Sequence, residues 1–389
     1  MTKPTPVVIT LESGFQCEGL GWGDWSQPRS AEIVFSTAMT GIEESLTDPS
    51  FCGQALVATV AHVGNTGFTG EDQESSKIWA EGLICRHLEH HPHHWRAKSS
   101  LTDWILAQGR FVVENVNTRA LTVALREGGS QRGILSTRGF FESISSAQSY
   151  LRSKVAPMSG LDLTDAVTAE TAWNFPVDSQ FGYWPYAESL RTLTQRKERP
   201  RVAVWDFGVK SNTLRLLSAM GLEVSVYPAR TQASEFMSPD IAGVLLSNGP
   251  GDPAAATHIV AELKKLVGRK PLFAICLGHQ LVAIAMGAKT YKMKFGHRGI
   301  HHPVTEFDAT GRSVRTWITS QNHGFAVDED SLPPTAWVTH RHGDDQSVEG
   351  VCYPGFDFGC DTVQFHPEAA PGPMEAHVLL KNFVRTLEP

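Results

Sequence analysis

The chain reads Pro271-Leu-Phe-Ala-Ile-Cys-Leu-Gly-His-Gln280 and then turns apolar again at Leu281-Val-Ala-Ile-Ala-Met286. This order of apolar run, cysteine, glycine and second apolar run predicts a buried strand, a sharp turn and a helix, with Cys276 at the turn. A thiol at such a turn lies at the positive end of the helix dipole and is presented to a substrate, as a nucleophile must be. Packing is the competing interpretation, because a free cysteine is usually a small buried hydrophobe.

Strand-like runs recur around this segment at intervals of about 20 residues, with helix-length segments between them. Strand, helix and strand at that rhythm imply a parallel sheet with right-handed crossovers. Since ligands bind beyond the carboxyl ends of the strands in such sheets, the residues after each strand should converge on one site. The runs are 202–206, 222–227, 243–247, 271–275 and, near the C-terminus, 361–365.

The pattern changes along the sequence and divides the chain into three parts. Residues 1–157 hold short β-like runs, glycines and two helical patterns, and predict an N-terminal α+β domain. Residues 158–200 are rich in Ser, Thr, Pro and aromatic residues and predict a connecting segment. Residues 201–389 predict a doubly wound, mostly parallel α/β domain. The N-terminal strands are expected at 7–11, 32–35 and 54–60 and the helices at 99–108 and 118–126, the second capped by Thr118 and closed by Gly128-Gly129.

Composition bounds the class of protein. The 389 residues carry a formal charge of −7, which argues against a general nucleic-acid or anionic-membrane surface. Six scattered cysteines without a C-x-x-C pair are typical of a reducing compartment. No stretch approaches the roughly 18 apolar residues of a membrane span, and the first residues do not read as a secretory leader. We therefore expect a soluble, cytoplasmic protein with neither nucleic acid nor a membrane among its partners.

Two further segments can supply partners for the thiol. Gly249-Pro-Gly-Asp-Pro253 predicts a stiff turn whose backbone N–H groups can point at a ligand, although a plain surface turn has the same pattern. After the last predicted strand, Pro367 is expected to keep the backbone extended, so that His366 and Glu368 project from one edge. A carboxylate there can fix the imidazole tautomer for the thiol, although most such pairs are solvated. Together the three segments match the logic of nucleophile, base and orienting group.

The same segments resemble a known family. Asn248-Gly-Pro-Gly-Asp-Pro253, Ile275-Cys-Leu-Gly-His-Gln280 and Gln364-Phe-His-Pro-Glu368 are similar to the three signatures of class I, triad-type glutamine amidotransferases. Further runs in both halves of the chain resemble the small subunit of carbamoyl-phosphate synthetase. They are Asp206-Phe-Gly-Val-Lys210, Met293-Lys-Phe-Gly-His297, Gln321-Asn-His-Gly-Phe-Ala-Val327, Pro367-Glu-Ala-Ala-Pro-Gly-Pro373, Phe35-Ser-Thr-Ala-Met-Thr-Gly41, Leu46-Thr-Asp-Pro-Ser50 and His62-Val-Gly-Asn-Thr-Gly67.

The resemblance implies that glutamine is hydrolysed through a thioester. The Cys276 thiolate would attack the side-chain carboxamide, His366 would protonate the departing ammonia and then activate water, and Glu368 would orient His366. Backbone N–H groups of Leu277 and Gly249 would form the oxyanion hole. The same residue-by-residue comparison expects the glutamine to be held by Ser50, Gly251, Gln280, Asn322, Gly324 and Phe325.

The resemblance also implies a partner protein. Ammonia would pass through a tunnel into a large synthetase subunit, where bicarbonate and two ATP give carbamoyl phosphate for pyrimidine and arginine synthesis. No cofactor and no metal site is expected in this chain, and ATP and Mg are expected on the large subunit.

Four places depart from the usual pattern of that family. They are Ile42, Asn117, Ala274 and Arg298-Gly-Ile-His301. None of them removes a catalytic group. Two alternatives therefore stay open beside the main expectation: an amidotransferase subunit that serves another synthetase, and a regulatory paralogue with little activity of its own.

A histidine tract stands outside these motifs. His87-Leu-Glu-His-His-Pro-His-His94 holds five of the 16 histidines of the chain. Imidazole suits zinc and nickel, but Pro92 disfavours a regular helical face of ligands. The favoured interpretation of the tract is a solvated loop.

Overall fold

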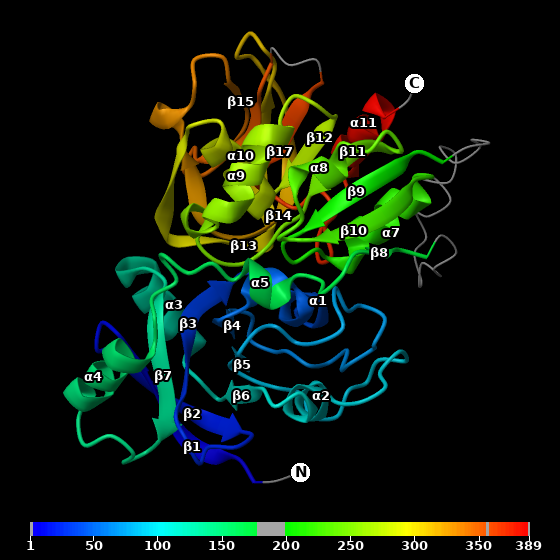
Figure 1. The fold of residues 1–389 in the computed structure, drawn as a ribbon. Helices are drawn as coiled ribbons and strands as arrows, with labels where there is room; N and C mark the ends of the chain where they lie inside the picture. Colours follow the sequence, from blue (N-terminus) through cyan, green and yellow to red (C-terminus); the bar gives the residue numbers. More distant parts are fainter. Residues whose placement is uncertain (1–2, 177–198, 355–357, 388–389) are drawn as a thin grey trace. The chain divides into compact units, whose positions relative to one another are not determined.

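A computed structural model describes residues 3–176, 199–354 and 358–387 of the chain. The chain forms two compact units, Met1–Leu161 with Met293–Gly299 and Asp162–Lys292 with Ile300–Pro389 (Figure 1). The segment 158–200 that was expected to connect two domains is divided. Its residues 158–161 belong to the first unit and 162–176 to the second, while 177–198 lie outside the described residues.

The first unit is built around seven strands that close on themselves. Their order is β1-β2-β6-β5-β4-β3-β7, and β7 pairs back with β1. The pairs β3–β4, β4–β5 and β5–β6 are parallel, and the other pairs are antiparallel. The strands are β1 Thr5–Leu11, β2 Gln16–Trp22, β3 Arg29–Ser36, β4 Gln54–Ala58, β5 Gly82–Ile84, β6 Phe111–Glu114 and β7 Gln131–Thr137.

Alternation along these strands separates two apolar clusters. On β4, Ala55 and Val57 pack in one cluster and Leu56 and Ala58 in the other, as the two-residue period of a strand requires. Helix α3 contributes to the first cluster and helices α1 and α2 to the second. This mixture of strands and helices confirms the predicted α+β character. The helices are α1 Ile42–Thr47, α2 Leu101–Ala107, α3 Thr118–Gly128 and α4 Ile144–Lys154, with a 3-10 turn η1 at Pro49–Phe51.

The prediction that Thr118 caps α3 is wrong. Asn117 is the cap: its Oδ1 accepts a hydrogen bond from Ala120 N at 3.1 Å, and Thr118 is the first helical residue. Asparagine is the stronger N-cap, because its short side chain reaches an unpaired N–H of the first turn. At the other end, Gly129 closes the helix with a φ of 89°, as the Gly-Gly pair predicted.

The second unit carries a ten-stranded sheet with a parallel centre. Its order is β14-β13-β15-β16-β17-β12-β11-β9-β10-β8. The five strands from β17 to β10 run parallel, whereas β8 and β16 join them antiparallel. The predicted parallel α/β sheet is thus confirmed at its centre and extended by antiparallel strands. The strands are β8 Trp173–Asn174, β9 Arg201–Asp206, β10 Glu223–Pro228, β11 Ile241–Leu246, β12 Leu272–Ile275, β13 Lys289–Phe307, β14 Ser313–Asp328, β15 Trp337–His342, β16 Val348–Cys352 and β17 Cys360–Val363.

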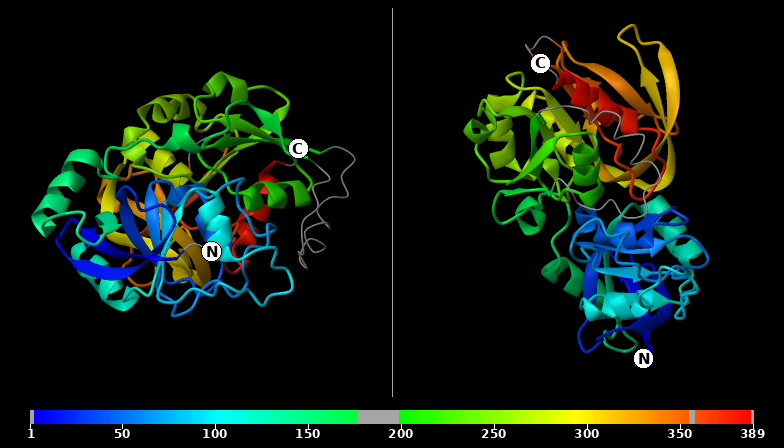
Figure 2. Two further views of the ribbon diagram at one scale, coloured as in Figure 1. Left: turned by 90° about the horizontal axis from the view of Figure 1, so that it is seen from below. Right: turned by 90° about the vertical axis from the view of Figure 1, so that its right-hand side faces the viewer.

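Helices cover both faces of the parallel centre (Figures 1 and 2). On β9, Val202 and Val204 pack in one apolar cluster with α7 and α11, while Ala203 and Trp205 pack in another with α8, α9 and α10. This is the doubly wound arrangement, in which central strands are buried on both faces. The helices are α5 Thr164–Val167, α7 Ser211–Ala219, α8 Ala233–Phe236, α9 Thr257–Leu266, α10 Leu277–Ala285 and α11 His377–Thr386, with 3-10 turns η2 Pro253–Ala255 and η3 Glu329–Ser331.

The long strands β13 and β14 have no counterpart among the sequence predictions. Strand β14 buries Gln321, Asn322 and His323 in succession, so it lacks the apolar alternation that marks a half-buried strand. Strand β13 likewise buries His297 and Arg298 in succession, so both strands escape a search based on hydrophobic period.

The described helices are short, and the longest of them, α3 and α4, have 11 residues each. Within the described ranges, no helix combines the length and the apolar character that crossing a membrane would need.

Trp205 is completely buried between the sheet and its helices, where its ring lies 4.7 Å from that of Phe236 and Nε1 donates to Ala229 O at 3.1 Å. We expect Trp205→Ala to lower the free energy of unfolding by about 3–5 kcal/mol, because it leaves a cavity and removes a hydrogen bond. Chemical denaturation followed by circular dichroism measures the loss. Trp173→Ala is the matched control, since that ring is 40% exposed, and it should change stability by only about 0.5 kcal/mol. Equal losses from both variants would contradict this core.

Candidate active site

Cys276 lies between strand β12 and helix α10, as the sequence predicted. Its φ of 52° and ψ of −103° are rare for a residue with a side chain, so the turn is strained. Backbone hydrogen bonds on both sides hold it: Cys276 N donates to Val363 O at 2.8 Å, and Gln280 N donates to Cys276 O at 3.1 Å. The neighbouring strand and the first turn of the helix thus fix the position of the thiol.

Two glycines let neighbouring segments close around this turn. A Cβ on Gly278 would lie 2.8 Å from Leu246 O, and Gly278 N donates to Ser247 O at 3.1 Å. A Cβ on Gly249 would lie 2.2 Å from Phe207 O and 2.8 Å from the Leu277 side chain. Any side chain at these two positions would push the loop after β11 away from α10. The glycines therefore bring Gly249 against Leu277, beside Cys276.

His366 and Glu368 meet through a turn, which corrects the sequence expectation. Strand β17 ends at Val363, and Ala369 N donates to His366 O at 3.1 Å, so the backbone around Pro367 is not extended. Proline fits here because its fixed φ is that of the second residue of a β-turn. The turn folds the carboxylate back, and His366 Nδ1 lies 2.6 Å from Glu368 Oε1. Nδ1–H therefore donates to Glu368, and Nε2 is the nitrogen left to exchange a proton.

Lys210 completes this group, and the sequence analysis assigned it no role. Its Nζ lies 3.0 Å from Glu368 Oε1 and also donates to Ala369 O. Asn212 supports the same turn, with Nδ2 donating to Glu368 O at 2.6 Å. Lys210 is 1% exposed and precedes helix α7. The run 206–210 had been noted only as part of the family resemblance. Nothing in a sequence pattern marks a lysine as buried.

Burial and charge act in opposite directions on these groups. Complete burial raises the pKa of Glu368, but Lys210 and His366 together hold that pKa below the ordinary glutamate value. Burial and the nearby Lys210 both lower the pKa of His366. The Glu368 carboxylate and an interaction with the Cys276 side chain outweigh them, so the pKa of His366 lies above its ordinary value. His366 therefore carries a proton near neutral pH and can give it to a leaving group.

One of the expected glutamine-binding residues contacts the thiol, and three others lie on β14 or α10. Cys276 Sγ lies 3.7 Å from Asn322 O on strand β14. Gln280 Nε2 donates to Phe325 O at 2.7 Å and to Gln364 Oε1 at 2.8 Å, which ties α10 to the same strand. Gly324 lies between Asn322 and Phe325 on β14.

The other two expected glutamine-binding residues lie in loops or turns. Gly251 follows β11 in the loop that also holds Gly249, and it has a φ of 96° and forms a bridge with Asp162. Ser50 belongs to the first unit, in η1, where its backbone N donates to Asp48 Oδ1 at 2.9 Å.

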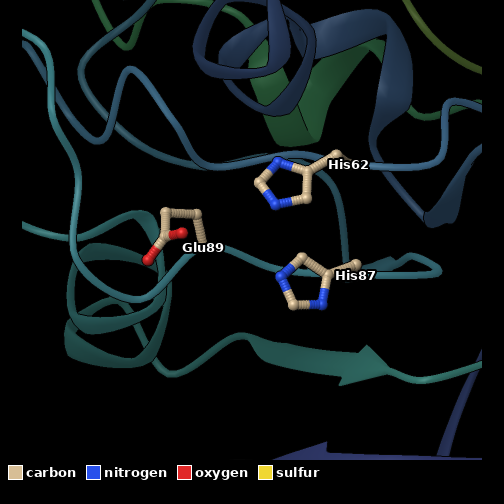
Figure 3. Close-up of side chains that lie close together, drawn as sticks. All are labelled: His62, His87 and Glu89. Carbon is tan, nitrogen blue, oxygen red and sulfur yellow. The ribbon is translucent and has the colours of Figure 1, made fainter.

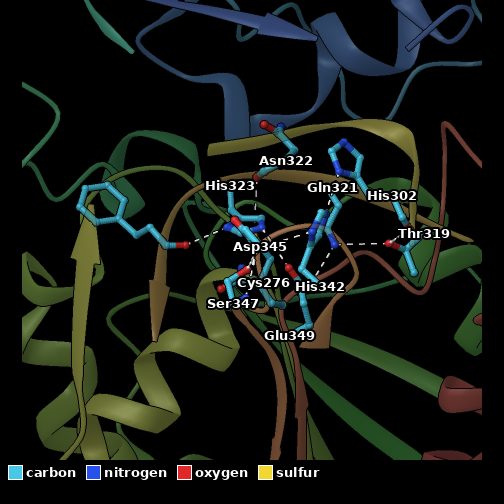
Figure 4. A network of polar contacts seen from close by, with 12 residues as sticks. Cys276, His302, Thr319, Gln321, Asn322, His323, His342, Asp345, Ser347 and Glu349 are labelled. Carbon is cyan, nitrogen blue, oxygen red and sulfur yellow. Dashed lines mark hydrogen bonds and ion pairs between the residues drawn. The ribbon is translucent and has the colours of Figure 1, made fainter. Parts of the chain in front are cut away.

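A buried polar network lies behind β14 (Figure 4). Glu349 is completely buried; its Oε2 accepts from Gln321 Nε2 at 2.8 Å, and its Oε1 lies 3.6 Å from His323 Nε2. His323 Nδ1 donates to Phe325 O at 2.8 Å. These contacts fix the strand segment that carries Asn322, and the sequence analysis did not identify Glu349. The network also contains His302, Thr319, His342, Asp345 and Ser347.

A thiol at a strained turn, a protonated imidazole and a carboxylate that orients it can perform nucleophilic acyl chemistry. Comparison with known proteins agrees with this chemistry. A family model described as "Glutamine amidotransferase class-I" matches residues 203–386, and one described as "Carbamoyl-phosphate synthase small chain, CPSase domain" matches residues 9–135. The two matches confirm the family resemblance that the sequence motifs indicated.

Curated relatives extend the similarity over the whole chain. A carbamoyl phosphate synthase small chain of Xanthomonas axonopodis pv. citri is 40% identical over 97% of this chain and 97% of its own length. The protein of the same name from Neisseria gonorrhoeae is 39% identical over 99% of this chain and 98% of its own. A third carbamoyl phosphate synthase small chain, from Haemophilus ducreyi, is 38% identical over 100% of this chain and 99% of its own length.

We expect Glu368→Gln to lower the pKa of His366, because the carboxylate is the main influence that favours the imidazolium. Titration of the imidazole signals by NMR, in protein with labelled histidine, measures that pKa. His340 is an internal control: burial lowers its pKa to about 4, with Glu349 and Arg315 as the charges that act on it, so it should not respond. An unchanged or higher pKa of His366 in the variant would contradict the proposed charge balance.

Proposed function

Because the chain belongs to the family of carbamoyl phosphate synthase small chains, we propose that Cys276, His366 and Glu368 form a glutaminase site that hydrolyses L-glutamine to glutamate and ammonia. The observation that carries this assignment is the strained turn at Cys276, because it holds a thiol beside an imidazole whose other nitrogen is bound to a buried carboxylate. A packing role for Cys276 would not need such a turn.

The reaction divides into two steps. The thiolate of Cys276 attacks the carboxamide carbon of glutamine, the C–N bond breaks, and the His366 imidazolium gives its Nε2 proton to the departing ammonia, which leaves a thioester and a neutral imidazole. Neutral His366 Nε2 then takes a proton from water, the resulting hydroxide attacks the thioester carbon, and glutamate and the thiol are released. Glu368 keeps the imidazole in one tautomer and stabilises its protonated form, and Lys210 keeps that carboxylate ionised.

Both steps place negative charge on the carboxamide oxygen. We assign its binding to the backbone N–H groups of Leu277 and Gly249, since Leu277 opens helix α10 and Gly249 lies against it. Each such donor contributes about 3–4 kcal/mol of transition-state stabilisation. We assign the holding of the glutamine to Ser50, Gly251, Gln280, Asn322, Gly324 and Phe325.

The ammonia is delivered to a large synthetase subunit, which makes carbamoyl phosphate from bicarbonate and ATP. ATP and Mg belong to that subunit in this proposal, and this chain needs no cofactor for the hydrolysis. The complex is proposed to act in the cytoplasm, and its product is suited to pyrimidine or arginine synthesis.

The four departures from the family pattern are compatible with activity. Ala274 is completely buried in β12, where its small side chain fits the core behind the turn. Asn117 caps α3, Ile42 begins α1, and Arg298 Nη1 donates to Phe295 O at 2.7 Å. None of these roles touches the thiol, so we favour the active enzyme over a regulatory paralogue. The family match at residues 9–135 likewise favours carbamoyl phosphate synthesis over service to another synthetase.

We expect Cys276→Ser to abolish glutamine-dependent carbamoyl phosphate synthesis, by about a thousandfold or more, because the variant lacks the nucleophile. Synthesis from added ammonia by the complete complex should persist, since that chemistry belongs to the large subunit. The two rates are measured with the reconstituted complex and each nitrogen source in turn. Loss of ammonia-dependent synthesis as well would contradict the division of labour.

The chain without its partner should hydrolyse glutamine slowly, and addition of the large subunit should raise the rate. Release of glutamate, followed at fixed glutamine concentration with and without the partner, measures the coupling. Equal rates in the two conditions would argue against delivery of ammonia to a partner and in favour of an independent glutaminase.

A further inference from the structure

Two loops of the first unit are joined side by side, and each carries histidine. Val63 forms a parallel bridge with Leu88: Val63 N donates to His87 O at 3.1 Å, and Glu89 N donates to Val63 O at 2.8 Å. This pairing fixes His62, in one loop, next to His87 and Glu89, at the start of the histidine tract in the other. The three side chains are therefore neighbours because of backbone hydrogen bonds and not because of their order in the sequence.

The three side chains form a compact set of metal-binding groups (Figure 3). One nitrogen of His62, one nitrogen of His87 and one carboxylate oxygen of Glu89 all lie within 4.8 Å of one another. The two imidazole rings stack, with centroids 4.4 Å apart and planes 26° from parallel. Both histidines are exposed and Glu89 is half-buried, so an ion can reach them from solvent.

Neighbouring residues prepare two of these groups to bind a cation. His62 Nδ1 lies 2.6 Å from Asn65 Oδ1, so Nδ1 carries the proton and Nε2 carries the lone pair. A partner on the second ring nitrogen is the usual arrangement for a histidine that binds a metal. Glu89 Oε1 accepts from His91 N at 2.8 Å, which orients the carboxylate.

We propose that His62, His87 and Glu89 bind one zinc ion, with water as the fourth ligand. Two imidazoles and one carboxylate are a common zinc ligand set, with bonds of about 2.0–2.2 Å that place tetrahedral ligand atoms about 3.3–3.5 Å apart. To close the observed separation of up to 4.8 Å to that distance, the two imidazole rings must rotate out of their stacked arrangement. The bound ion links the loop at 62–67 to the loop at 87–94.

This site differs from the one considered for the tract alone. Pro92 still argues against a regular row of ligands within 87–94, and no pattern in the sequence connects the tract to His62, which lies 25 residues before His87. The site lies within the first unit and has no part in the proposed glutamine chemistry, so either proposal can fail without the other.

Zinc titration of the full chain tests the proposal, by calorimetry or by competition with a chromophoric chelator, in protein free of any histidine tag. We expect one zinc per chain. His62→Asn and Glu89→Gln should each weaken binding by about 100-fold or more, because each removes a ligand. Asn65→Ala should weaken it by about tenfold, since it removes only the partner that fixes the tautomer of His62.

His93→Asn is the matched control. His93 belongs to the same tract and is exposed, but it lies outside the set of three, so this variant should bind zinc as the native chain does. Glutaminase activity should be the same in all four variants, which also shows that they are folded. The proposal is overturned if the native chain binds no zinc, if His62→Asn binds as tightly as the native chain, or if His93→Asn abolishes binding.

Discussion

The carboxylate of Glu368 is completely buried, and the active site depends on how that charge is balanced. Lys210 Nζ lies 3.0 Å from Oε1 and His366 Nδ1 lies 2.6 Å from it, so one anion holds two cations. Removing one partner of a buried ion pair typically costs about 3–5 kcal/mol, because a charge is left uncompensated away from water. The balance therefore ties the start of α7 to the turn after β17. It also holds His366 Nδ1–H on Glu368, so that Nε2 is the nitrogen left to exchange a proton.

The parallel sheet supplies the place for this group. Strands β9, β11, β12 and β17 are neighbours and run in one direction, so the segments that follow them meet at one edge. Cys276 follows β12, the glycine loop follows β11, and His366 follows β17. Because Gly249 and Gly278 have no side chains, the loop after β11 and helix α10 can approach closely on either side of the thiol. Core packing on both faces of the sheet keeps the strained turn in place.

The sequence was most informative where hydrophobic period and turn chemistry act locally. The five parallel strands were predicted within one or two residues of their observed ends, and Cys276 was placed correctly between strand and helix. The errors have physical causes. Pro367 is compatible with both an extended segment and a turn, and the turn is favoured because it brings Glu368 to His366. Strands β13 and β14 were missed because their buried positions include polar residues, such as His297 in β13 and Gln321 in β14.

The order of motifs by itself determined the fold class and the family, and it placed Cys276 at the turn between strand and helix, because each of these depends on residues close together in the chain. Only the tertiary structure decided which distant side chains share a charge or a ligand. Lys210 reaches Glu368 across 158 residues, and backbone pairing at Val63 places His62 beside His87 and Glu89. Such contacts depend on burial and on the pairing of separate segments, and a linear pattern of residue types contains neither.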